Sequence, residues 1–304
     1  MPNDNSSRQR LAYLVMLVAP LFFATNLVFG RGVVSEVSPF TLALIRWLAV
    51  AAALSPFIYA ERMKLRVVVQ RRWGLLLALA FLAMWVCGGG VYFGLQWTTA
   101  TNATLIYTTS PVIILVLEGI FRGRPVRLRE GAGAVIAFLG VATIVLRGDP
   151  AALFSLSFNV GDLVLVAAAF AWAGYSILYR SPELQQVSNA AMLGLLAALG
   201  AGLLLPAAAV EWIMGARLPI TAQAWSGIAG IVVFASLLAF MTFQYGIRQL
   251  GAPLAGVFMY LLPPYGVVLA ALLLGERFEP FHAAGIALVM GGVILATFPA
   301  RRNL

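Results

Sequence analysis

Polar side chains are rare in the long apolar stretches of this 304-residue chain, so those present are the residues that could do chemistry. A polar group inside a lipid-spanning helix is costly and is therefore a candidate for a functional role. Arg46 could bind a substrate carboxylate, because a guanidinium offers parallel N–H donors that match it. Asn26 could contribute to the same site. For both side chains, snorkelling to the membrane surface is the open alternative.

A second candidate is a polar stripe on the apolar stretch 101–121. If this stretch is helical, five residues lie on one face: Thr101, Thr104, Thr108, Pro111 and Glu118. The stripe predicts the wall of a cavity, to which we add Tyr107 as a binding residue. The alternative is structural, because threonine hydroxyls often bond to carbonyls of their own helix. Glu118 could carry a proton or bind an ammonium group, or it could snorkel.

Two prolines are candidate hinges. Pro111 and Pro263 each remove a backbone hydrogen bond in the middle of an apolar stretch. We predict that the chain can bend at these points during transport. A static bend is the alternative.

Aromatic faces form a third candidate group. One such face is predicted in 73–96, from Trp85, Gly88, Tyr92 and Gln96, and another in 160–179, from Trp172, Tyr175, Ser176 and Tyr179. Rings with polar tips suit a flat amphipathic ligand. An aromatic belt at the membrane surface is the alternative, and it fits Gln96 and Tyr179 better than the two tryptophans.

Several functions are disfavoured. The single histidine and the single cysteine, Cys87, lie far apart in the sequence, so we expect no catalytic residues, no zinc site and no disulfide. We found no phosphate-binding loop, and we expect no cofactor. The net charge of +9 could suggest nucleic acid, but no polar domain exists to bind it.

The composition instead predicts an all-α polytopic membrane protein. Hydrophobic residues make up 62% of the chain and charged residues only 10%, far from the values of soluble proteins. A spanning helix needs about 20 mostly apolar residues. About ten such segments are predicted: 11–30, 39–60, 73–96, 101–121, 131–147, 160–179, 189–210, 224–247, 252–274 and 281–299.

The basic residues predict the orientation of these segments. With ten spans, fifteen of the 20 Lys and Arg residues fall on the side of the N-terminus, four fall on the opposite side, and Arg46 lies within a span. Because short cytoplasmic loops carry the excess of positive charge, both termini are predicted to be cytoplasmic. We expect the protein to lie in the cell inner (plasma) membrane.

An internal repeat divides the chain. At an offset of 152 residues and without a gap, 94–146 aligns with 246–298. The alignment pairs Pro111 with Pro263, Gly123 with Gly275, Gly133 with Gly285, and Gly140 with Gly292. We therefore expect two five-helix repeats, 11–147 and 160–299. An odd number of spans inverts the second copy, which is typical of secondary transporters with a cavity between the halves.

The block that ends each half carries a family resemblance. Residues 94–124 and 246–278, including Gly275-Glu276-Arg277, resemble the EamA-type repeat of the drug/metabolite transporter superfamily. At finer grain the chain is similar to YddG-type exporters of aromatic amino acids. The resemblance implies ten helices, cytoplasmic termini and a central cavity. The first half departs from it, with Gly123-Arg124-Pro125 in place of Gly-Glu-Arg.

These observations predict an exporter of small amphipathic metabolites, most simply amino acids with aromatic ones favoured, that works by alternating access in the lipid bilayer. Its small-molecule substrate would contact Asn26, Arg46, Trp85, Tyr92, Thr104, Tyr107, Thr108, Trp172 and Tyr175. Export of cationic drugs, antiport of nucleotide sugars, and a membrane protein that transports nothing are the alternatives. The oligomeric state is open, with a monomer as one option.

Overall fold

The structure, a computed structural model that describes residues 3–275 and 277–297, contains only helices and connecting segments in those ranges. Nine of its helices or helical runs there are long and apolar enough to cross a membrane. In addition, α1, which has 34 residues, contains the first predicted span, 11–30. The predicted all-α polytopic fold is confirmed. Glu276, and residues 298–299 at the end of the predicted last span, lie outside the described ranges.

In chain order the elements are α1 (Asn3–Glu36), α2 (Pro39–Ala60), α3 (Arg62–Ala80), the π-helical η1 (Phe81–Gly90), α4 (Val91–Gly94), α5 (Ala100–Tyr107), α6 (Ser110–Arg122), α7 (Leu128–Val145), the 3₁₀ turn η2 (Pro150–Ser155), α8 (Val160–Leu178), the 3₁₀ turn η3 (Pro182–Gln186), α9 (Asn189–Ile213), α10 (Ala222–Gly230), the π-helical η4 (Ile231–Leu238), α11 (Ala239–Leu250), α12 (Ala252–Phe258), the 3₁₀ turn η5 (Met259–Leu261), α13 (Leu262–Leu274) and α14 (Pro280–Thr297).

The polar tract between the second and third spans is helical. The basic tract that precedes residue 73 is helical and belongs to α3, which leaves helical geometry only at Arg72 (φ −136°, ψ 32°). From there the helix continues through η1 and α4 to Gly94. The basic tract is therefore a short helix that meets the third span at a kink at Arg72, and the span itself begins near residue 73, as predicted.

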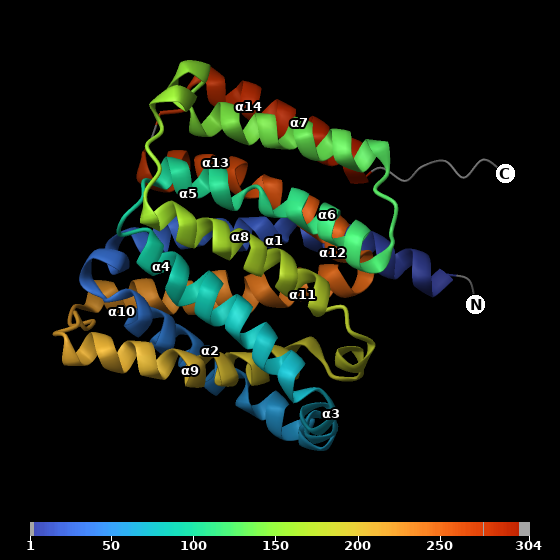
Figure 1. Cartoon of the computed structure of the whole chain (residues 1–304), viewed down its shortest axis with the longest axis vertical. Coiled ribbons are helices and arrows are strands. Elements are labelled where there is room, and N and C mark those ends of the chain that lie inside the picture. Colours follow the sequence, from blue (N-terminus) through green and yellow to red (C-terminus); the bar gives the residue numbers. More distant parts are fainter. Residues whose placement is uncertain (1–2, 276, 298–304) are drawn as a thin grey trace.

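The packing of α7 on α14 shows that the two halves are inverted copies. A Cβ atom built on Gly133 would lie 2.5 Å from the carbonyl oxygen of Gly292, and one on Gly140 would lie 2.7 Å from that of Gly285. Each of these residues thus touches the repeat equivalent of the other, as a twofold relation requires. The helices run antiparallel, side by side (Figure 1). Small residues allow this close backbone approach.

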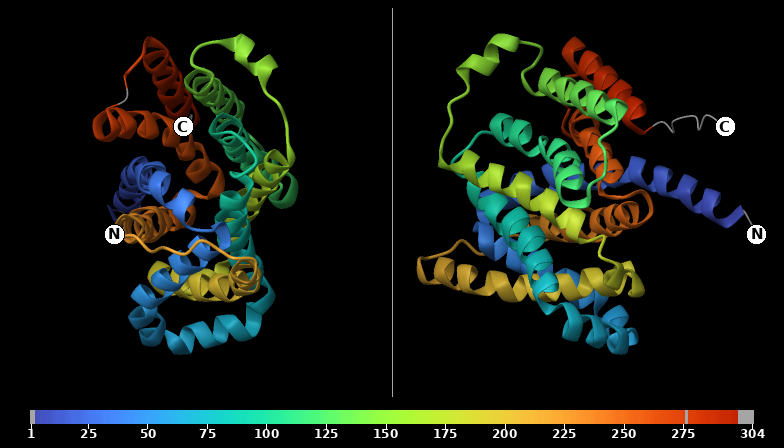
Figure 2. Two further views of the ribbon diagram at one scale, coloured as in Figure 1. Left: turned by 90° about the vertical axis from the view of Figure 1, so that its left-hand side faces the viewer. Right: turned by 45° about the vertical axis from the view of Figure 1, so that its right-hand side comes forward.

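The other spans also pack against spans of the opposite half or in equivalent pairs. The second span of each half packs against that of the other, as α2 does on α9, and α1 packs along α10, η4 and α11 as α8 does along η1 and α4. The halves therefore interlock, with α7 and α14 at one end of the molecule and α3 and α9 at the other (Figure 2). We call the side where α1 begins and α14 ends the terminal side, and the opposite side the far side (Figure 1).

Both halves break their fourth span at the same point. The first break separates α5 from α6 just before Pro111, and the second separates α12 from α13 just before Pro263. Proline has no N–H to continue the backbone ladder, which explains the position of each break. The predicted hinge role of the two prolines stays a prediction.

Candidate functional site

A cavity of about 300 Å³ lies between the two halves, at the lower end of the range for ligand pockets. Its walls come from the first four spans and from α8, η4, α11, η5 and α13. Among the predicted site residues it collects Asn26, Arg46, Thr104, Tyr107, Thr108, Trp172 and the predicted hinge Pro111.

Arg46, on α2, turns into the protein rather than towards the membrane surface. Its side chain is buried and donates from Nε to the Ser236 hydroxyl (2.6 Å) and from Nη2 to the Ala235 carbonyl (2.8 Å). Both acceptors belong to η4, and a π-helical turn commonly occurs at functional sites. The Ser236 hydroxyl itself donates to the Ile231 carbonyl (2.8 Å). The Arg46 side chain therefore does not snorkel to the membrane surface in this structure.

A chain of polar groups continues from Arg46 across the first half. Its Nη1 donates to the Tyr92 hydroxyl (3.1 Å), which in turn donates to the Asn26 side-chain oxygen (3.3 Å). Three of the five guanidinium N–H groups are thus used, and one is left on each terminal nitrogen. Within the described part of the chain, Arg46 forms no ion pair. The cavity therefore contains a buried positive charge with donors to spare.

Aromatic rings form much of the remaining wall. Trp172 on α8 stacks on Phe243 (centroids 4.9 Å apart, planes at 24°) and meets Phe23 and Phe240 edge-on at 5.6 and 5.7 Å. Tyr107 lies 6.5 Å from Trp172. The indole N–H of Trp172 is buried and has no partner in the structure. The wall around Trp172 is therefore mostly apolar and offers an indole N–H that can donate to a ligand.

The cavity wall contains no carboxylate among the described residues. Its polar groups other than Arg46 are neutral: Asn26, Cys87, Thr104, Tyr107, Thr108, Ser110 and the two indoles of Trp47 and Trp172. The Thr108 hydroxyl donates back to the Thr104 carbonyl (2.8 Å), so the structural alternative holds for that residue. The site can thus accept a group that is flat, largely apolar and negatively charged at one end.

Four predicted residues lie outside the cavity wall. Tyr92 lines the smaller neighbouring pocket and reaches the site through its hydrogen bond with Arg46. Tyr175 lies behind Trp172 (5.6 Å), fully buried, with its hydroxyl accepting from Gln244 (2.8 Å). Trp85 packs on Phe81 (5.2 Å) instead of facing the cavity, because the π-helical η1 departs from the 3.6-residue period that would align it with Tyr92. Pro263 is not part of the wall, although the adjacent Leu262 is.

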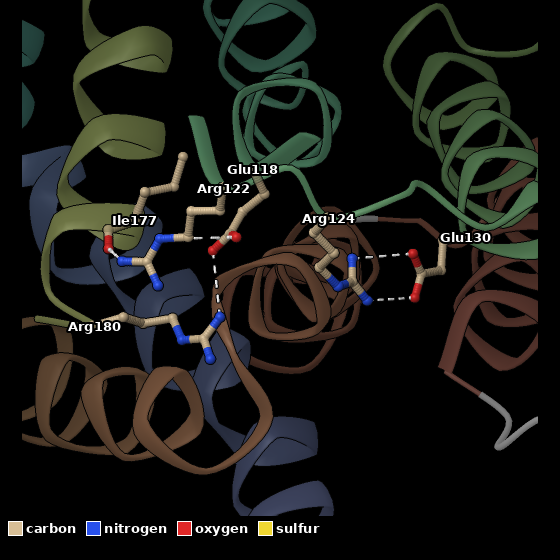
Figure 3. A network of polar contacts seen from close by, with 6 residues as sticks. All are labelled: Glu118, Arg122, Arg124, Glu130, Ile177 and Arg180. Carbon is tan, nitrogen blue, oxygen red and sulfur yellow. Dashed lines mark hydrogen bonds and ion pairs between the residues drawn. The ribbon is translucent and has the colours of Figure 1, made fainter. Parts of the chain in front are cut away.

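On the terminal side, where α6 ends, Glu118, Arg122 and Arg180 form an ion-pair cluster (Figure 3). Glu118 is only 1% exposed, and it accepts from Arg180 Nη1 (3.4 Å) and pairs with Arg122 Nε (4.0 Å). Arg122 also donates to the carbonyl of Ile177 (2.9 Å). The cluster therefore joins α6 of the first half to the end of α8 in the second, and Glu118 does not snorkel.

Further contacts join the halves on the same side. Arg180 lies over Gly251, where φ is +91° and a Cβ atom would stand 3.3 Å from the arginine Nη1. Arg72 forms an ion pair with Glu183. The Glu61 carboxylate accepts from the Ser188 backbone (3.2 Å), and hydrogen bonding to Ser188 holds the pKa of Glu61 below its ordinary value.

A second, smaller pocket lies beside the cavity. Leu95 lines the cavity and also a smaller pocket of about 210 Å³ that includes Gln96 and Arg217. Ala270, the repeat equivalent of Glu118, is partly exposed, whereas Glu118 is buried. The far side therefore has no carboxylate at the position that corresponds to Glu118.

Sequence reasoning missed several residues at this site. Ser236 and Gln244 are polar residues in apolar stretches, so the rule that selected Arg46 could have selected them too. Phe23, Trp47 and Phe240 carry no such signal, because aromatic residues are common throughout an apolar chain. Only their position around the cavity distinguishes them.

Comparison with known proteins agrees with this geometry. The EamA-like transporter family matches residues 10–146 and 159–298, once for each half. The chain belongs to this family. An uncharacterized transporter of Archaeoglobus fulgidus is 27% identical over 287 residues, which cover 94% of this chain and 96% of that protein. The chain is accordingly a multi-pass membrane protein of the transporter type.

Two relatives of this EamA-like chain have names that state a substrate. The aromatic amino acid exporter YddG of Ancylobacter novellus is 27% identical over 234 residues, 72% of this chain and 77% of that protein. A probable terminal-alkyne amino-acid exporter of Streptantibioticus cattleyicolor is 28% identical over 196 residues, 64% of this chain and 63% of that one. A solved crystal structure matches with a TM-score of 0.76 at 20% identity, covering 96% of this chain and 99% of that one, which shows the shared fold.

Proposed function

We propose that this EamA-like transporter exports small amphipathic metabolites that carry a carboxylate, with aromatic amino acids as the favoured substrates. The observation that carries the proposal is the buried Arg46 guanidinium, which has no acidic partner among the described residues and faces a cavity with aromatic walls. The substrate carboxylate would pair with Arg46, and the ring would lie against Trp172 and Phe240. The names of two relatives point to the same class.

The proposed mechanism is alternating access about the cavity. The equivalent helix breaks before Pro111 and Pro263 lie next to the cavity, at positions where the two halves could change angle. On the terminal side, the Glu118 cluster would have to separate before substrate could enter. We further propose that both termini are cytoplasmic, in the inner membrane, from the distribution of basic residues and from a Salmonella typhimurium relative named as an inner membrane transporter.

Two other substrate classes fit the cavity less well. A cationic drug would need a carboxylate at this depth, and the described cavity residues include none. A nucleotide sugar carries several negative charges, whereas Arg46 is the single cation among the described residues of that wall. Transport rather than catalysis is proposed because the cavity residues form no nucleophile–base pair.

The test is uptake of labelled L-phenylalanine by proteoliposomes that contain the purified full chain, compared with empty liposomes. We expect saturable uptake in wild type. In Arg46→Lys the KM should rise about tenfold, because an ammonium cannot pair with both carboxylate oxygens as a guanidinium does. Arg66→Lys, at an exposed arginine of α3, is the matched control and should leave KM unchanged. Correctly folded protein that moves no amino acid from a broad panel would sink the proposal.

A further inference from the structure

The cavity supplies hydrogen-bond donors and positive charge but little for a positively charged ligand group. Arg46 contributes its charge and two unused N–H groups, and Trp172 contributes an unpartnered indole N–H. The Asn26 oxygen already accepts from Tyr92. The described lining contains no aspartate or glutamate. A complementary ligand must therefore bring acceptors and a negative charge.

An amino acid brings both a carboxylate and an ammonium group. The carboxylate is matched by Arg46. The ammonium group, however, would be desolvated in a cavity whose described lining carries one fixed charge, and that charge is also positive. Burying a charge without a partner is costly, and like charges repel more strongly where water is excluded. No charged group in the described wall therefore attracts the amino group of the substrate.

We propose that the cavity selects aromatic carboxylates as a class and does not require the α-amino group. Aromatic 2-oxo acids and 3-arylpropanoates would then be substrates at least as good as the corresponding amino acids. This inference rests on the proposed transport function and deepens it: Arg46 determines the preference, and the ring of Trp172 and its aromatic neighbours accommodate the rest of the molecule.

The experiment is inhibition of labelled L-phenylalanine uptake in proteoliposomes at neutral pH, with direct uptake of labelled 3-phenylpropanoate alongside, corrected for its leak into empty liposomes. Three unlabelled competitors are compared: L-phenylalanine, 3-phenylpropanoate, which lacks the amino group, and phenethylamine, which lacks the carboxylate. We expect 3-phenylpropanoate to inhibit at or below the concentration that L-phenylalanine needs. Phenethylamine should need at least about ten times more, the factor expected for one charge-assisted hydrogen bond.

A variant assigns the preference to Arg46. In Arg46→Gln the concentration of 3-phenylpropanoate needed for half-inhibition should rise about tenfold or more, while that of phenethylamine should stay or fall. Arg66→Gln, at the exposed surface of α3, should leave both unchanged. If Arg46→Gln does not fold, the wild-type competitor series still decides.

The outcomes separate this inference from the proposed function. Inhibition by L-phenylalanine but not by 3-phenylpropanoate, or inhibition by phenethylamine equal to that of the acids, overturns the inference and leaves amino-acid export standing. Uptake of labelled 3-phenylpropanoate without uptake of L-phenylalanine supports the carboxylate class and overturns amino-acid export. Uptake of neither overturns both.

Discussion

Replacement of Glu118 by glutamine should weaken the contact between the two halves on the terminal side. Glu118 is a buried carboxylate between Arg122 and Arg180, and the second arginine belongs to the other half of the protein (Figure 3). Glutamine keeps the size of the side chain but not its charge. Without the carboxylate, two arginines face each other as like charges whenever this side is closed. When it opens, they separate and become hydrated, so the substitution favours the open state.

The size of the shift follows from the geometry. Both pairs are loose, at 3.4 and 4.0 Å, and the arginine side chains are 36% and 35% exposed. Pairs exposed to this extent contribute up to about 1 kcal/mol each, so losing both costs roughly 1–2 kcal/mol. This corresponds to a change of about 5- to 30-fold in the equilibrium between the terminal-side-open and far-side-open states.

Cys87 provides the assay, because it is the single cysteine of the chain and lines the cavity. A membrane-impermeant methanethiosulfonate is applied from one side in inside-out vesicles and from the other in intact spheroplasts. In Glu118→Gln, the ratio of terminal-side to far-side labelling rates should rise by the factor above, with Cys87→Ser as the unlabelled blank.

The neighbouring ion pair of Arg124 and Glu130 supplies the control. It is a tighter ion pair on the same side (2.7 Å), but both of its residues belong to the first half (Figure 3). Glu130→Gln should leave the labelling ratio unchanged. The reasoning is refuted if Glu118→Gln folds and labels like wild type, or if both variants shift the ratio equally.

Two further predictions separate cavity from scaffold. In the proteoliposome uptake assay, Trp172→Ala should raise KM for L-phenylalanine about tenfold, because ring contacts with the substrate are lost. Trp85→Ala, outside the cavity, should leave KM close to wild type. A larger effect of Trp85→Ala than of Trp172→Ala would contradict the assignment of Trp172 to the binding wall. Gly140→Leu should lower the free energy of unfolding by about 1–3 kcal/mol or more, because its Cβ would meet the backbone nitrogen of Val289 at 2.6 Å. Gly291→Leu, with open space around the glycine, should not lower it. Thermal unfolding in detergent, followed by tryptophan fluorescence, compares the two variants.

Much of the fold was predictable because lipid restricts what a chain can do. A segment inside the hydrocarbon must satisfy its own backbone, so each long apolar stretch becomes a helix. The repeat offset of 152 was equally informative. It placed four glycines in two equivalent pairs, and the structure brings those residues together at the crossing of α7 and α14. Pro111 and Pro263 likewise marked the helix breaks, because proline removes a donor wherever it stands.

The candidate site was less predictable, because its contacts join residues far apart in the chain. Polarity alone selected Arg46, but its direction is decided by Ser236, 190 positions away, and by the turn geometry of η4. Helical spacing predicted both Trp85 and Trp172 as binding residues, but Trp85 lies on the π-helical η1 and packs on Phe81 instead of facing the cavity. The sequence by itself determined which segments cross the membrane and that they form two inverted copies, since both follow from local composition and repetition. Only the tertiary structure decided which polar groups face the cavity and that Glu118 pairs with an arginine of the other half, because these depend on which helices meet.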